Sequence, residues 1–198
     1  MLYIERINLV MLRVPKTGST AWEVALKPHA SAMLSDISNQ KHMTLDRYLR
    51  HFNPLIVSQT GMQPDILITL REPISWLNSW YRYRQRSELL GHKNSTANKS
   101  FQEFAQAYLA VPSPPFADVG QQFHYVHSKL KAPSVMSFKY EATQGLKHYL
   151  EARLDTCLNS PQKNVSPAGD TFLDDEVRRA VQTRLEQDYQ AWETARDI

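Results

Sequence analysis

Short apolar runs alternate with amphipathic segments along most of the chain. The runs within residues 7–14, 66–70 and 134–140 have the length and composition that are typical of strands buried in a sheet. A weaker apolar run at 55–57 predicts one further strand. In the remaining segments apolar residues recur at helical spacing, and these predict helices over 21–26, 45–52, 74–90, 101–111, 119–130, 174–196 and a segment that follows Tyr140 and ends at Leu154. This alternation predicts an α/β fold in which helices flank a central, mostly parallel sheet.

Length and composition favour one folded domain that covers residues 1–198. The chain is 42% hydrophobic, which is enough to build a core, and it contains neither an internal repeat nor a linker-like stretch. Its formal net charge of +3 suits an anionic small molecule or acceptor, and is too low for the charge density of a nucleic-acid binder. The single cysteine, Cys157, excludes an intrachain disulfide and a cysteine-based metal cluster.

No targeting or membrane-spanning pattern is recognisable. The first residues lack a basic segment followed by an apolar one, and no apolar stretch approaches the length of a membrane span. We therefore expect a soluble, cytoplasmic protein. The alternative is the catalytic part of a longer membrane-anchored enzyme, and a methionine directly before the first strand favours a native start instead.

The turn that leaves the first strand has the composition of an anion cradle. Its sequence, from Pro15 to Thr20, is Pro-Lys-Thr-Gly-Ser-Thr, and a predicted helix follows. Gly18 permits a tight turn, and the first N–H groups of the helix have no partner within it and favour a negative charge. Lys16 adds a positive charge, and Ser19 and Thr20 add hydroxyl groups. The alternative is an ordinary strand-to-helix turn with a surface lysine.

A second polar cluster follows the strand at 66–70. Arg71 lies where this strand ends, at the edge where open α/β sheets hold their ligands. Ser79 comes eight residues later, about two turns into the next helix, so its hydroxyl and the guanidinium of Arg71 are expected to bind one phosphate. The alternative is an arginine that packs on a helix end and a buried serine.

The two clusters together resemble the nucleotide motifs of sulfotransferases that use 3'-phosphoadenosine 5'-phosphosulfate (PAPS). The first resembles the 5'-phosphosulfate loop, and Arg71-Glu72-Pro73 with Ser79 resembles the 3'-phosphate motif. The usual nucleoside-triphosphate loop differs, because it places glycine directly before Lys-Ser/Thr. Weaker similarities to the small, carbohydrate-type bacterial members lie at 41–44, 138–141, 163–166 and 188–189.

The resemblance implies a three-layer, P-loop-like fold and sulfuryl transfer from PAPS to an acceptor hydroxyl, with a carbohydrate as one candidate. It implies no metal, because a lysine replaces magnesium. Lys16 would stabilise the leaving phosphate, and the donor would be bound by Lys16, Thr17, Gly18, Ser19, Thr20, Arg71 and Ser79.

The acceptor hydroxyl requires a base, for which we choose His42. This residue precedes the expected start of the helix at 45–52, and a helix N-terminus keeps an imidazole neutral near pH 7. A solvated histidine beside a helix cap is the alternative, and the competing bases are His51, His92, His124 and Glu23.

Two other functions are compatible with these motifs. A P-loop kinase or nucleotide hydrolase would also bind phosphate, but the strand at 66–70 ends in arginine where a magnesium-binding aspartate is expected. A non-catalytic module could bind an anionic partner on the same fold.

Overall fold

The computed structural model describes residues 1–34, 41–131, 133–159 and 171–197. The chain divides into two compact units. The first comprises Met1–Arg71, Gln122–Asn164 and Ala191–Ile198, and the second comprises Glu72–Gln121 and Val165–Gln190.

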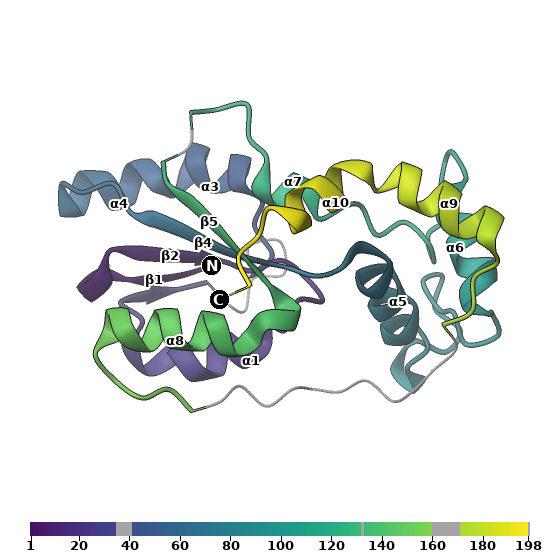
Figure 1. Cartoon of the computed structure of the whole chain (residues 1–198), viewed down its shortest axis with the longest axis horizontal. Coiled ribbons are helices and arrows are strands. Elements are labelled where there is room, and N and C mark those ends of the chain that lie inside the picture. Colours follow the sequence, from purple (N-terminus) through teal and green to yellow (C-terminus); the bar gives the residue numbers. More distant parts are fainter. Residues whose placement is uncertain (35–40, 132, 160–170, 198) are drawn as a thin grey trace. The chain divides into compact units, whose positions relative to one another are not determined.

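The first unit is built on one mixed sheet of five strands in the order β3-β1-β2-β4-β5 (Figure 1). The strands are β1 (Leu2–Ile4), β2 (Leu9–Leu12), β3 (Ala32–Met33), β4 (Asp65–Leu70) and β5 (Val135–Lys139). β4 lies parallel to both β2 and β5, whereas β1 is antiparallel to β2 and β3. The α/β class is therefore confirmed, and the parallel arrangement applies to β2, β4 and β5.

Helices pack on both faces of this sheet because strand side chains alternate between the faces. Val10 and Leu12 of β2 belong to the core with α3 (Leu45–His51) and α4 (Asn53–Thr60). Leu9 and Met11 belong to the other core, with α1 (Ser19–Leu26) and α8 (Thr143–Leu154). Figure 1 shows α3 and α4 on one face of the sheet and α1 and α8 on the other. The unit also contains η1 (Glu5–Ile7), η2 (Lys27–His29), η4 (Tyr140–Ala142) and α7 (Phe123–Val126).

Two expectations about this unit were wrong. Residues 55–57 lie in helix α4, which Pro54 starts rather than prevents, because a proline fits the first turn of a helix. The strand predicted within 7–14 is confirmed as β2, but the sequence did not indicate β1, which precedes η1 and forms a hairpin with β2; Asn8 reverses the chain in the left-handed region at φ 47°. The predicted helix at 119–130 is reduced to α7.

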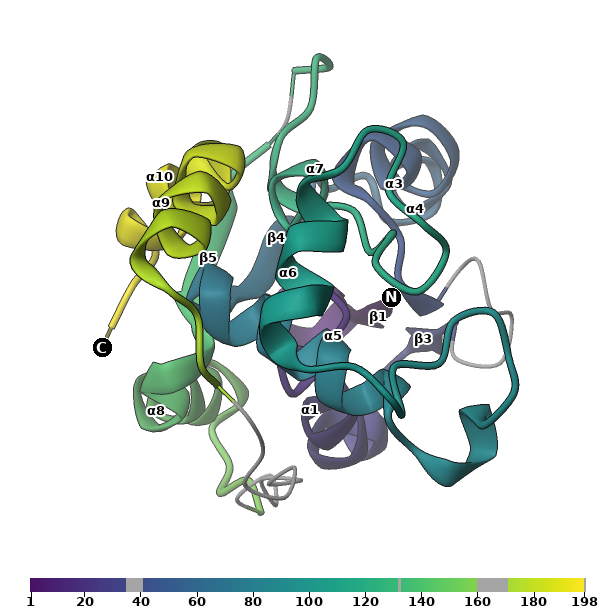
Figure 2. The same ribbon diagram turned by 90° about the vertical axis from the view of Figure 1, so that its right-hand side faces the viewer.

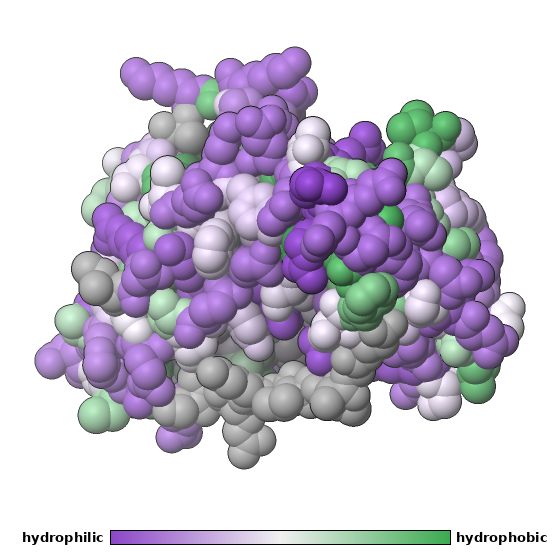
Figure 3. Space-filling view, turned by 45° about the vertical axis from the view of Figure 1, so that its right-hand side comes forward, coloured by the Kyte–Doolittle hydropathy of each residue, from purple (hydrophilic) through white to green (hydrophobic). Residues whose placement is uncertain are grey.

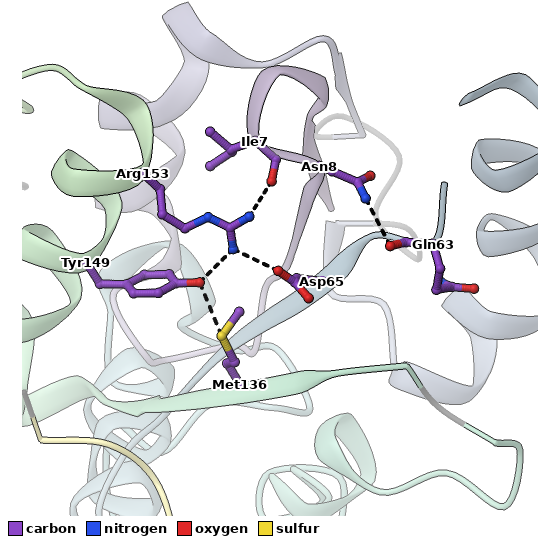
Figure 4. A network of polar contacts seen from close by, with 7 residues as sticks. All are labelled: Ile7, Asn8, Gln63, Asp65, Met136, Tyr149 and Arg153. Atoms are coloured by element: carbon purple, nitrogen blue, oxygen red, sulfur yellow. Dashed lines mark hydrogen bonds and ion pairs between the residues drawn. The ribbon is translucent and has the colours of Figure 1, made fainter. Parts of the chain in front are cut away.

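A polar network joins α8 to the amino end of β4 (Figure 4). The Arg153 guanidinium donates to Asp65 Oδ2 at 2.8 Å, to the Tyr149 hydroxyl at 2.8 Å and to the Ile7 carbonyl at 2.5 Å. Asp65 is the first residue of β4, so this network lies at the opposite end of the strand from Arg71.

The second unit is helical. It contains α5 (Pro73–Arg84), η3 (Ser87–Leu89), α6 (Phe101–Leu109), α9 (Asp175–Arg184) and the start of α10 (Glu186–Glu193). Figure 2 labels α5, α6, α9 and α10. Its core consists largely of aromatic and aliphatic residues of α5, α6 and α9, among them Trp76, Tyr81, Phe104 and Val181. The helix predicted over 174–196 is divided at Leu185.

The face drawn in Figure 3 is mostly hydrophilic, with apolar side chains in small separate groups. Among the residues that the structure describes, no helix combines the length and the apolar character that crossing a membrane requires.

Candidate functional site

The turn between β2 and α1 has an unusual backbone. Lys16 has φ 67° and Gly18 has φ 70°, so both lie in the left-handed region. This conformation suits glycine but costs a residue with a side chain about 1–2 kcal/mol. Such strain concentrates at functional sites. Lys16 is therefore held in a backbone conformation that is unfavourable for a residue with a side chain.

Helix α1 begins without any acceptor from a side chain. Its N-cap is Gly18, no side chain caps it, and no acidic residue lies in its first turn. The Gly18 carbonyl accepts from the N–H groups of Ala21 at 3.0 Å and Trp22 at 3.3 Å, which starts the helical pattern. The N–H groups that precede these have no partner within the helix, and the helix dipole adds positive potential there. This end of α1 is suited to an anion.

The hydroxyl groups of this turn differ in their surroundings. Thr17 is buried, and its hydroxyl donates to the Val14 carbonyl at 2.9 Å. Because a hydroxyl has one proton, the 2.9 Å contact between Thr17 Oγ1 and Thr69 Oγ1 then has Thr69 as donor. Thr17 therefore joins the turn to β4. Ser19 is buried, and Thr20 is exposed.

Arg71 reaches the same turn. Its Nη1 donates to the Lys16 carbonyl at 3.4 Å, and its guanidinium carbon lies 4.8 Å from the centre of the Tyr140 ring. Arg71 and the turn that contains Lys16, 55 residues apart in sequence, are therefore in contact. The side chain of Arg71 supplies forked donors of the geometry that phosphate oxygens require.

Tyr140 also limits the residue at position 18. A Cβ atom added to Gly18 would lie 2.9 Å from Tyr140 Cε2 and 3.2 Å from Cδ2. Glycine is therefore required here twice, for its φ and for the space that the ring occupies. The sequence indicated Tyr140 only through a weak family similarity, because nothing in its neighbourhood signals a contact with a turn so distant in sequence.

His42 is held so that one ring nitrogen is available to accept a proton. Its Nδ1 lies 2.8 Å from the Arg13 carbonyl oxygen, which only accepts hydrogen bonds. The proton of the neutral ring is therefore assigned to Nδ1, and Nε2 keeps its lone pair. Burial lowers the pKa of His42 below its ordinary 6.5, and the charges of Arg13 and Lys41 lower it further, so that the ring is neutral at pH 7.

The other candidate bases are less suitable. Glu23 forms an ion pair with the guanidinium of Arg13, a residue that is 1% exposed and that the sequence gave no reason to select. His51, His92 and His124 are all exposed. Among the candidate histidines, His42 alone is half-buried, and its tautomer is fixed by the Arg13 carbonyl.

Ser79 belongs to the second unit, where it is 4% exposed on α5. Its joint action with Arg71 stays a prediction. In the same unit, Glu72 accepts from Ile74 N at 3.2 Å and from Ser75 N at 2.6 Å, and the Tyr189 hydroxyl donates to it at 2.6 Å. The segment 163–166, which carried part of the family similarity, lies outside the described residues.

Gln122 carries no functional motif in the sequence, but the structure places it beside Arg71. It is 1% exposed, and its carboxamide contacts the backbone of Arg71. A lone glutamine between a proline-rich break and a short helix carries no sequence signal for such a role.

Comparisons of the chain with models of protein families, with curated proteins and with solved structures found no match.

Proposed function

We propose that the protein transfers a sulfuryl group from PAPS to an acceptor hydroxyl, on a three-layer, P-loop-like fold. One observation carries this proposal: the Arg71 guanidinium lies on the carbonyl of Lys16, at the start of the helix whose N-terminus suits an anion. One phosphate group of a nucleotide could then bind at the α1 N-terminus beside Lys16, and a second phosphate group could bind to the Arg71 guanidinium.

The cationic and hydrogen-bonding groups of the proposed site match the charged groups of PAPS. Lys16 and the N-terminus of α1 suit the 5'-phosphosulfate, and Arg71 suits the 3'-phosphate, with Ser79 as its predicted partner. Glu23, the one acid of α1, is neutralised by Arg13 and so does not oppose the ligand. Because the α5 N-terminus is occupied by Glu72, the 3'-phosphate depends on side chains rather than on that helix end.

The chemistry needs positioning and charge stabilisation more than covalent participation. The acceptor oxygen forms a bond to sulfur while the bond from sulfur to the 5'-phosphate oxygen breaks. His42 Nε2 takes the proton of the acceptor hydroxyl, and adenosine 3',5'-bisphosphate leaves with the bonding electron pair. The ammonium group of Lys16 stabilises the charge that develops on the leaving oxygen.

Calorimetric titration distinguishes this function from its alternatives. We expect adenosine 3',5'-bisphosphate to bind in EDTA with at least tenfold higher affinity than ATP with magnesium, since each added ionic contact to phosphate is worth about 1.5–3 kcal/mol. Preference for ATP with magnesium would contradict the proposal and favour a kinase or hydrolase. Binding of neither nucleotide would also contradict it and would leave an anion-binding module.

A further inference from the structure

Gln122 forms a two-point clamp on the backbone of Arg71. The Arg71 N–H donates to Gln122 Oε1 at 2.9 Å, and Gln122 Nε2 donates to the Arg71 carbonyl at 2.8 Å. The two residues are 51 positions apart, and both belong to the first unit. The carboxamide of Gln122 is thereby satisfied on both its donor and its acceptor side.

The clamp begins where the sheet stops. The last pair of the ladder between β4 and β5 joins Leu70 to Lys139, so Arg71 is the first residue beyond it. The side-chain amide of Gln122 continues the hydrogen bonding of the strand by one residue. The chain leaves the first unit after Arg71 and re-enters it at Gln122. The clamp therefore joins the two residues at which the first unit is interrupted.

The guanidinium of Arg71 is held separately. It lies over the ring of Tyr140, the residue directly after β5, and donates to the carbonyl of Lys16. Arg71 is therefore fixed at its backbone by Gln122 and at its side chain by Tyr140 and the turn. An arginine with many rotamers loses less entropy on binding phosphate when it is already held in place.

We propose that Gln122 is a positioning residue whose clamp holds Arg71 against the Lys16 turn for recognition of the 3'-phosphate. Gln122 acts through Arg71 and needs no contact with the ligand. This assignment rests on the proposed function, because it names what the arginine recognises.

The test is the ratio of two affinities, those for adenosine 3',5'-bisphosphate and for adenosine 5'-phosphate, measured by calorimetry in EDTA. In the wild type the ratio reports the 3'-phosphate contact, and Arg71→Ala gives its value without the arginine. We expect Gln122→Met, which keeps the volume but removes both hydrogen bonds, to lower the ratio roughly tenfold towards the Arg71→Ala value. The affinity for the 5'-phosphate should change less than about threefold.

Three further variants separate positioning from stability. Arg153→Met removes the network at the other end of β4, so it lowers stability but should leave the ratio unchanged. If Gln122→Met does not fold, Tyr140→Leu tests whether holding Arg71 in place matters for the ratio, and Tyr140→Phe, which keeps the ring, is its control. We expect the leucine variant to lower the ratio and the phenylalanine variant to retain it.

The outcomes distinguish the two proposals. A wild type that discriminates between the ligands, with a folded Gln122→Met that discriminates equally well, would overturn the clamp and leave the proposed function intact. If Gln122→Met does not fold, equal ratios in the two Tyr140 variants would show that positioning of Arg71 does not affect recognition of the 3'-phosphate, and would overturn the role assigned to Gln122. A wild type that binds both ligands equally would overturn both proposals.

Discussion

Two helices that each follow a strand of the sheet begin in opposite ways. Helix α5, which follows β4, starts with the carboxylate of Glu72 on the N–H groups of Ile74 and Ser75. Helix α1, which follows β2, starts with Gly18 and has no side-chain cap. The chain therefore satisfies one helix N-terminus with its own anion and leaves the other without one.

The difference extends to the surroundings of each helix start. Glu72 also accepts a hydrogen bond from Tyr189, which makes the α5 cap part of the packing of its unit. At α1, the neighbouring groups are cationic: Lys16 precedes the cap, and Arg71 donates to the Lys16 carbonyl. A helix start that lacks a cap and is surrounded by cations is what an anionic ligand requires. The comparison thus separates a structural cap from the helix start that we propose as the anion site.

The largest effect is expected from removing the charge at the α1 end. Lys16→Met should lower turnover about 100- to 1,000-fold, because the leaving phosphate loses its preorganised cation. Bisphosphate affinity should fall much less. Lys27→Met, at an exposed lysine beyond the other end of α1, serves as the control and should match the wild type. Turnover of Lys16→Met within a few-fold of the control would contradict the role of Lys16.

A substitution at the α1 cap should destabilise the first unit. Gly18→Ala adds a methyl group in the left-handed region and against Tyr140, and we expect a loss of about 3 kcal/mol in the free energy of unfolding by denaturant. Gly61→Ala is a matched control, because φ is 69° there and nothing lies within 4 Å of the added Cβ, so the loss should be about 1 kcal/mol. Equal losses would show that the Tyr140 contact is unimportant.

An acidic residue in the first turn of α1 should make this helix start resemble that of α5, where Glu72 supplies the anion. Thr20→Glu places an exposed carboxylate in the first turn, which should weaken bisphosphate binding by about tenfold or more through repulsion of like charges. Stability should rise by about 0.5 kcal/mol through the helix dipole. Thr20→Gln has nearly the same shape without the charge, so equal affinities of the two variants would contradict an anion site at this helix end.

The environment of His42 also predicts a pH dependence. The pKa of His42 is lowered from 6.5 by burial and by nearby positive charges, so the base is unprotonated at neutral pH. We expect kcat/KM to be constant at neutral pH and to fall only below pH 6.5, by about tenfold per unit below the pKa. His42→Gln should lose this acid limb, and His51→Gln should retain it. An acid limb that persists in His42→Gln would assign the base elsewhere.

The smallest effect is expected at the α5 cap. Glu72→Ala should lower the free energy of unfolding by about 1–2 kcal/mol, because it removes the acceptor of two N–H groups and of the Tyr189 hydroxyl. Glu88→Ala, at an exposed acid of the same unit, should cost less than about 0.5 kcal/mol. Equal denaturation midpoints for the two variants would show that Glu72 is not a structural cap.

The sequence could predict those parts of the fold that local pattern determines. Strands β2, β4 and β5 appear as apolar runs, and α1, α3, α6 and α8 follow from helical spacing and from caps such as Thr44, whose hydroxyl accepts from Arg47 N. The run 55–57 misled the prediction because three apolar residues have no decisive periodicity. Tertiary packing determines whether such a segment forms a helix or a strand. Ile56 is 9% exposed in α4, whereas Leu55 beside it is 58% exposed.

The candidate site was predictable in its cations and in its glycine, but not in the contacts that position them. Lys16, Gly18 and Arg71 belong to short motifs that directly follow predicted strands, so the sequence alone identifies them as candidates. Gln122 and Tyr140 are brought to Arg71 only by the fold, from far along the chain. The same applies to Arg13, whose carbonyl holds His42.

The most direct test of the central claim is a crystal structure with adenosine 3',5'-bisphosphate bound. The 5'-phosphate is predicted at the N-terminus of α1, within hydrogen-bond distance of the N–H groups that follow Lys16, and the 3'-phosphate on the guanidinium of Arg71. A nucleotide that contacts neither Lys16 nor Arg71, or one whose phosphates both avoid the α1 N-terminus, would contradict the claim.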